Sequence, residues 1–183
     1  MLRNHLDGET QRLFLALWPN EAVRCAVADL ARRLIPSGRR VPPENLHVTL
    51  AFLGNVAGEA TPRVWAIGAN LAGSEFALEL NRIGCWPRQR ISWIAPSRTP
   101  TVLTRLNREL RQALGKAGFP VPNRRFVPHM TLARQVGPHA FHDVAPVVWA
   151  IDRITVVRSH LEQSGARYEI LREWPLQAGN TKS

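Results

Sequence analysis

The four-residue pattern His-x-Thr-Leu occurs twice in this chain, at residues 47–50 and again at residues 129–132. Alternate side chains of a β-strand share a face, so each copy would place a histidine beside a threonine hydroxyl and turn the other two side chains into a core. Two such strands brought together would offer two imidazoles and two hydroxyls to one ligand. Because imidazole gives and takes protons near neutral pH, the repeat predicts a site for proton transfer.

The segments ahead of the two motifs follow the same plan. A short apolar run at residues 12–18 predicts a buried strand, apolar spacing over residues 20–34 predicts a helix, and prolines mark a loop before the first motif. The same order returns as a strand at residues 91–95, a helix at residues 100–116 and a loop before the second motif. An internal duplication explains this match, and the sequence therefore predicts two similar lobes.

The rest of the chain adds strands and helices in mixed order. Its apolar pattern predicts a helix at residues 59–71, a loop at 137–146, and strands at 76–83, within 147–157 and at 168–174. This mixture favours an α+β fold, with two antiparallel sheets facing each other and helices outside, over a doubly wound parallel sheet. We expect one domain over residues 12–176 with flexible tails at 1–11 and 177–183. No glycine-rich phosphate loop is present, which argues against a nucleotide triphosphate or dinucleotide cofactor.

The net charge of the chain is +10, from 24 Lys and Arg residues against 14 Asp and Glu residues. A surplus of this size attracts polyanions, of which nucleic acid is the commonest. Every basic residue except Lys116 and Lys182 is arginine, so codon bias is an equal explanation. The charge alone leaves both explanations open.

Cysteine is limited to Cys25 and Cys85, without the spacing of a zinc site or a disulfide framework. Cys25 lies in an apolar run of the first predicted helix, and we expect it to be buried. The apolar run at residues 13–18 is too short for a signal peptide or a membrane span. We therefore expect a soluble, cytoplasmic protein without a membrane partner. We also expect a monomer, although none of these features indicates the oligomeric state.

Residues around the two motifs narrow the prediction. They are Arg12-x-Phe14-x-Ala16, Val41-Pro42-Pro43-Glu44-Asn45-Leu46-His47, Pro128-His129, Arg134 and Gly165-Ala166-x-Tyr168. Together with both motifs, these residues resemble the 2H phosphoesterase superfamily, and within it the RNA 2′,3′-cyclic phosphodiesterase family, also called 2′-5′ RNA ligase or LigT-like. The resemblance covers about residues 12–176.

The resemblance implies metal-independent hydrolysis of a 2′,3′-cyclic phosphate, on an RNA end or a small cyclic nucleotide, to a 2′-phosphomonoester. It implies a bilobal fold with an open cleft between pseudo-symmetric lobes, each supplying one motif, and neither cofactor nor metal ion. By resemblance, His47 is the proton donor and His129 the proton acceptor. Thr49 and Thr131 would donate hydrogen bonds to the non-bridging phosphate oxygens, whose charge grows in the transition state.

Two alternatives stay open. In the first, an RNA hydroxyl takes the place of water, so that the protein joins and cleaves 2′-5′ linkages reversibly. In the second, the chain is a non-catalytic basic RNA-binding module whose histidines only contact phosphate. A nuclease assay in chelator separates the leading hypothesis from the second alternative, because a binding module would show no turnover.

Several arginines are further candidates for phosphate binding. Arg134 lies five residues beyond His129, so on a regular strand it would face away from that histidine. The pairs Arg39-Arg40 and Arg124-Arg125 stand just ahead of the two motifs. They would either follow phosphates along the cleft or form solvated turns.

Two aromatic residues, Phe14 and Trp93, lie on the first strands of the two lobes. They would either stack a base or pack in the core. The sequence His139-x-x-His142 has no thiol or carboxylate set beside it and is a poor zinc pattern. We therefore expect no metal site.

Overall fold

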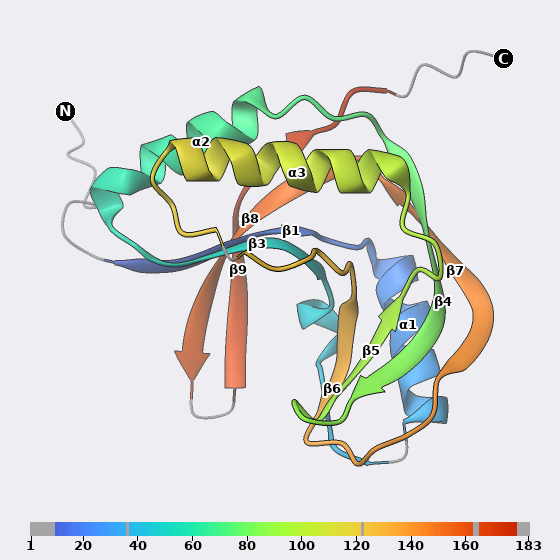
Figure 1. The fold of residues 1–183 in the computed structure, drawn as a ribbon. Coiled ribbons are helices and arrows are strands. Elements are labelled where there is room, and N and C mark those ends of the chain that lie inside the picture. The colour runs from blue at the N-terminus through green and yellow to red at the C-terminus, as the bar shows by residue number, and fades with distance from the viewer. Residues whose placement is uncertain (1–9, 36, 122, 163–164, 179–183) are drawn as a thin grey trace, which may run out of the picture.

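The computed structural model describes residues 10–35, 37–121, 123–162 and 165–178 (Figure 1). Its α-helices are α1 (Glu21–Leu34), α2 (Thr61–Asn70) and α3 (Thr101–Lys116). Its strands are β1 (Gln11–Leu17), β2 (Arg39–Arg40), β3 (Val48–Val56), β4 (Phe76–Trp86), β5 (Ile91–Ala95), β6 (Met130–Arg134), β7 (His142–Ile151), β8 (Arg153–Glu162) and β9 (Gly165–Pro175). The predicted tails fall largely outside these residues, at 1–9 and 179–183. At their inner ends, Gln11 pairs with Val56 and the Gln177 amide donates to the Gly73 carbonyl.

The strands join edge to edge in the order β7-β4-β5-β6-β3-β1-β8-β9, and β2 also pairs with β6. All of these pairings are antiparallel. The α+β fold is therefore confirmed. The two predicted sheets are halves of one hydrogen-bonded sheet, because a single residue pair, Val48 and Met130, joins β3 to β6. Each half contributes one histidine motif next to that junction.

The helices form where apolar residues repeat at helical spacing, and α1 and α3 each cover the half of the sheet opposite to the strand they follow. On α3, the stripe of Leu103, Leu106, Leu110 and Leu114 is fully buried. This helix follows β5 but packs on β3, whereas α1 follows β1 but packs on β6 and β7. Figure 1 shows α2 and α3 together across one half, and α1 against the other half, where it contacts β6 and β7. The two lobes are thus intertwined.

Helix α1 corrects one expectation. Asn20 caps its start by accepting a hydrogen bond from the Val23 amide at 3.0 Å. Its buried face carries Val23, Val27 and Ala31. Cys25 lies on this helix but is exposed, because it is two residues from both Val23 and Val27 and therefore points away from their face. The prediction that Cys25 is buried was wrong.

A second correction concerns residues 137–146, where the sequence predicts a loop. Strand β7 already begins at His142 and includes Pro146. Pro146 favoured the loop prediction because proline has no backbone N–H to donate to a neighbouring strand. It is accommodated here because β7 is an edge strand and the β4–β7 register shifts opposite Asn81, between the pairs Leu80–Val147 and Arg82–Asp143.

Candidate active site

A β-bulge interrupts both motif strands at the same place. In the β1–β3 pair, the residues opposite neighbouring positions of β1 are Thr49 and Ala51, so Leu50 is the extra residue. In the β5–β6 pair they are Thr131 and Ala133, so Leu132 is the extra residue. A bulge reverses the alternation of side chains beyond it. The fifth residue after each histidine therefore returns to the histidine's face of the sheet.

Arg134 is that fifth residue in the second motif. On a regular strand it would face away from His129, but the bulge at Leu132 brings it into the same cavity as both histidines. The expected orientation was therefore wrong, and Arg134 remains a candidate phosphate ligand. The corresponding residue of the first motif is Phe52, which also lines the cavity.

The cavity has a volume of about 1000 Å³ and is lined by residues of both lobes. Among them are the motif residues His47, Thr49, His129 and Thr131, so the predicted convergence of the two motifs is present. The described lining includes seven arginines and no Asp or Glu. These arginines are Arg12, Arg39, Arg40, Arg111, Arg124, Arg125 and Arg134. A site so lined attracts an anion, and it includes both predicted arginine pairs.

His47 lies in an aromatic cage, by which we mean Phe14, Trp18 and Tyr168. The Trp18 ring stacks on the imidazole at 5.3 Å between centroids, Phe14 lies tilted at 4.9 Å, and Tyr168 presents its edge at 5.2 Å. Burial is the main cause that lowers the pKa of His47, to about 4, and the charges of His129 and Arg134 lower it further. The contact with the Asn45 carbonyl acts in the opposite direction.

His129 has a different surrounding. One ring, Trp86, meets it edge-on at 4.5 Å. Burial again is the main cause that lowers its pKa, and the guanidinium groups of Arg124 and Arg134 add to the effect, against a hydrogen bond to the Val127 carbonyl that raises it. Both histidines are therefore neutral at pH 7 in the free protein.

The hydrogen bonds of the two rings fix their tautomers. Nδ1 of His47 lies 2.7 Å from the Asn45 carbonyl oxygen, and Nδ1 of His129 lies 2.8 Å from the Val127 carbonyl oxygen. A carbonyl only accepts, so Nδ1 carries the hydrogen in each neutral ring and Nε2 keeps a lone pair. Nε2 of His47 is 3.1 Å from the Thr49 hydroxyl, which therefore donates to it. Each Nε2 is the atom available for proton transfer.

The two candidates for base stacking are both buried, but only Phe14 lines the cavity. Phe14 is 3% exposed and lies against His47. Trp93 is 7% exposed and packs between Trp86 and Phe141. Its ring fits there because the strand opposite has Gly84, where a Cβ would lie 2.5 Å from the indole. Trp93 does not line the cavity, and the structure gives its stacking role no support.

Three site residues were missed from the sequence, namely Trp18, Trp86 and Tyr168. Tyr168 belongs to a segment that carries the family resemblance, which was the available signal. Trp86 follows the predicted end of its strand at residue 83, but β4 continues to Trp86 and delivers the indole to His129. Trp18 directly precedes Pro19, so the sequence indicated only that it is the last residue of a strand and not that it lies beside His47.

Within the described ranges, no group of three or more His, Cys, Asp or Glu side chains could hold a metal ion. His139, one half of the His139-x-x-His142 pattern, instead contacts the buried Ser92 hydroxyl at 3.1 Å. No helix in the described part of the chain is both long and apolar enough to span a bilayer.

The model of the 2′-5′ RNA ligase superfamily matches residues 19–163. The chain belongs to this superfamily. Among curated members, it is 31% identical to the RNA 2′,3′-cyclic phosphodiesterase of Escherichia coli, covering 92% of this chain and 98% of that one. It is 33% identical to the RNA 2′,3′-cyclic phosphodiesterase of Thermus thermophilus, covering 91% and 90%. The resemblance drawn from the motifs is thereby confirmed.

Solved structures of the superfamily show the same fold. The chain matches apo E. coli LigT with a TM-score of 0.85 at 30% identity, over 93% of this chain and 99% of that one. It matches E. coli LigT complexed with 3′-AMP with a TM-score of 0.83 at 30% identity, over 92% and 99%. The bilobal α+β architecture is therefore that of the superfamily.

Proposed function

We propose that this protein hydrolyses the 2′,3′-cyclic phosphate at an RNA end to a 2′-phosphomonoester, without a metal ion. The observation that carries the proposal is the shared cavity into which both lobes direct a histidine and a threonine, among seven arginines. The curated relatives named RNA 2′,3′-cyclic phosphodiesterase support the cyclic phosphodiesterase activity.

In the proposed reaction, Nε2 of His129 accepts a proton from water as the water oxygen attacks phosphorus. The bond between phosphorus and the 3′ oxygen breaks, and the 3′ oxygen takes a proton from Nε2 of His47. The products are a 3′ hydroxyl and a 2′-phosphomonoester, with His129 protonated and His47 neutral. Exchange of protons with solvent restores the starting state. Each of the two proton transfers contributes about 10²–10⁴-fold to the rate.

The acid needs a proton that the free protein lacks, because the pKa of His47 is about 4. The negative charge of the bound phosphate favours an imidazolium beside it and so raises this pKa. Protonation also releases the Thr49 hydroxyl, which in the free protein donates to Nε2. The hydroxyl can then donate to a non-bridging phosphate oxygen. Substrate binding thus favours protonation of the acid, His47, and the same step frees the Thr49 hydroxyl to bind phosphate.

Thr131 and Arg134 would complete the phosphate site from the other lobe. Both line the cavity with His129, and a hydroxyl and a guanidinium both donate to phosphate oxygens. Donors already in place where negative charge grows stabilise the transition state without reorganisation. We assign both residues to phosphate binding.

The test is incubation of an RNA oligonucleotide ending in a 2′,3′-cyclic phosphate with the protein in EDTA, followed by identification of the monoester. We expect full turnover in EDTA and a 2′-phosphate product. A 3′-phosphate product would overturn the direction of ring opening. Binding without any turnover, with or without added divalent cations, would instead establish a non-catalytic RNA-binding module.

A second candidate is reversible 2′-5′ ligation, which the description of the matching family favours. Here a 5′ hydroxyl of RNA takes the place of water at phosphorus, and the same pair of histidines serves. Adding an oligonucleotide with a free 5′ hydroxyl to the assay decides between the two. Accumulation of a joined product at the expense of the monoester would assign ligation.

A further inference from the structure

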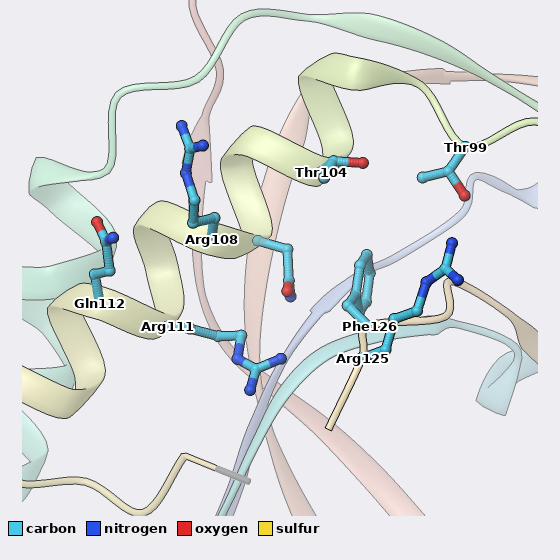
Figure 2. A pocket seen from close by; sticks show the side chains of 8 residues that line it. Thr99, Thr104, Arg108, Arg111, Gln112, Arg125 and Phe126 are labelled. Carbon is cyan, nitrogen blue, oxygen red and sulfur yellow. The ribbon is translucent and has the colours of Figure 1, made fainter. Parts of the chain in front are cut away.

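A second cavity, of about 460 Å³, lies between α3 and the segment that leads into the second motif (Figure 2). This volume lies within the usual range of ligand pockets, about 300–1,000 Å³. On α3 its wall includes Thr104, Arg108 and Gln112. On the opposite side, Arg125 and Phe126 face the helix. Nothing in the reaction proposed above uses this cavity.

The second cavity adjoins the active-site cavity, because Arg111, Arg125 and Phe126 line both. Arg111 also donates a hydrogen bond of 2.8 Å to the Arg124 carbonyl, which fixes the segment before His129 against α3. A bound polymer whose end lies between the histidines can therefore continue from the active-site cavity past Phe126 to Arg108 in the second cavity.

The chemistry of this path is that of a single-stranded polynucleotide site. The described lining of the second cavity contains three arginines and no Asp or Glu. In Figure 2 the guanidinium groups of Arg111 and Arg125 lie on either side of the half-buried Phe126 ring. Sites for single-stranded nucleic acid combine such cationic groups, which contact phosphates, with aromatic rings on which bases stack.

We propose that the second cavity binds the RNA backbone on the 5′ side of the terminal cyclic phosphate. Arg125 and Arg108 contact successive backbone phosphates, and Phe126 stacks a base between them. This inference rests on the proposed function, and it adds a preference of the enzyme for oligonucleotides over mononucleotides. Arg108 sets that preference, because it lines the second cavity and not the first.

The test compares Arg108→Gln with Arg105→Gln. Both positions are exposed on α3 and both variants remove one positive charge, but Arg105 pairs with Glu109 outside the two cavities. For Arg108→Gln we expect kcat/KM to fall about tenfold on an oligonucleotide ending in a 2′,3′-cyclic phosphate, the loss of one charged contact. On a 2′,3′-cyclic mononucleotide it should stay within twofold of the wild type. Arg105→Gln should leave both substrates unchanged.

Gln112→Glu is a second variant that brings a negative charge into the same cavity without removing a cation. It should lower kcat/KM on the oligonucleotide selectively, as Arg108→Gln does. The proposal is overturned if Arg108→Gln and Gln112→Glu leave the oligonucleotide unaffected, if they lower both substrates equally, or if Arg105→Gln has the same effect.

A binding measurement separates this proposal from the proposed function. With an oligonucleotide ending in a 2′-phosphate, the slope of log K against log salt should become less steep by about 0.7 in Arg108→Gln, since one phosphate contact on a single strand is lost. If the wild type turns over neither substrate but this change in slope appears, the proposed function is wrong, whereas the proposed RNA site in the second cavity is supported. If both substrates are turned over and the slope is unchanged, only the proposed RNA site in the second cavity is contradicted.

Discussion

The two histidine motifs share a backbone and differ in their surroundings. Both strands carry a bulge one residue after the threonine, and both rings direct Nδ1 to a carbonyl two residues before the histidine. His47 lies in the cage of Phe14, Trp18 and Tyr168, whereas His129 meets Trp86 and the charges of two arginines. A duplicated backbone thus fixes the position of the two imidazoles, and unlike neighbours make them chemically distinct.

The fifth residue after each histidine carries the sharpest difference. In the second motif Arg134 brings a positive charge directly to the cavity, and in the first Phe52 occupies that place. The cation of the first lobe comes instead from β1, where the Arg12 guanidinium lies over the Phe52 ring at 4.9 Å. The phosphate site is therefore asymmetric.

The largest effect is expected from the histidines themselves. His47→Ala and His129→Ala should each lower kcat by about 10²–10⁴-fold, since each removes one of two proton transfers. The double variant should be little worse than either single one, because the two groups act as a unit. His142→Ala, an exposed histidine on β7, is the matched control and should keep full activity. A single motif variant within tenfold of the wild type would contradict the two-histidine site.

The threonines come next. Thr49→Val and Thr131→Val should each lower kcat by about 10²-fold, as expected for loss of one donor to a developing negative charge. Thr49→Ser and Thr131→Ser keep the hydroxyl and should stay close to the wild type in steady-state kinetics. Equal activity of the serine and valine variants at either position would show that the hydroxyl there does not serve the reaction.

Replacing Arg134 should change the pH dependence as well as the rate. A nearby positive charge disfavours an imidazolium, so Arg134→Gln should raise the pKa of both His47 and His129. The base must be neutral to accept a proton, so the acid limb of kcat/KM against pH should move to higher pH. Arg134→Lys keeps the charge and should keep the limb. A limb that does not move in Arg134→Gln would separate Arg134 from the histidines.

The aromatic neighbours should give the smallest change in rate and the most specific change in pKa. Trp18→Ala opens the cage to water and should raise the pKa of His47 from about 4 towards its ordinary value, leaving His129 little changed. Trp86→Ala should raise the pKa of His129 and leave that of His47 little changed. Titration of the two imidazole signals by NMR measures both. A common shift of both signals in either variant would show that the two surroundings are not independent.

The sequence predicted what depends on local pattern. Apolar spacing located the buried stripe of α3, and the repeated motif located both histidines and both threonines in one cavity. It did not predict the bulges at Leu50 and Leu132, because an extra residue in one strand is a property of its register with another. The predicted orientation of Arg134 was wrong for this reason.

Non-local packing accounts for the other misses. Cys25 lies among apolar neighbours in the chain, and only the position of the sheet decides which face of α1 is buried. The cage around His47 combines Phe14 of β1 and Trp18 just after it with Tyr168 of β9, which is far from both in the sequence. Its hydrogen-bonded frame is equally non-local, since the Asn45 amide donates to the Ala166 carbonyl at 2.9 Å.

Opposite roles for the two histidines are tested most directly by a substrate whose 3′ bridging oxygen is replaced by sulfur. A thiolate leaves without protonation, so this substrate needs the base but not the acid. We predict that His47→Ala regains activity near the wild-type rate on the sulfur-bridged cyclic phosphate, while His129→Ala stays inactive. Recovery of His129→Ala in place of His47→Ala would reverse the two roles, and recovery of neither would contradict general acid catalysis at this site.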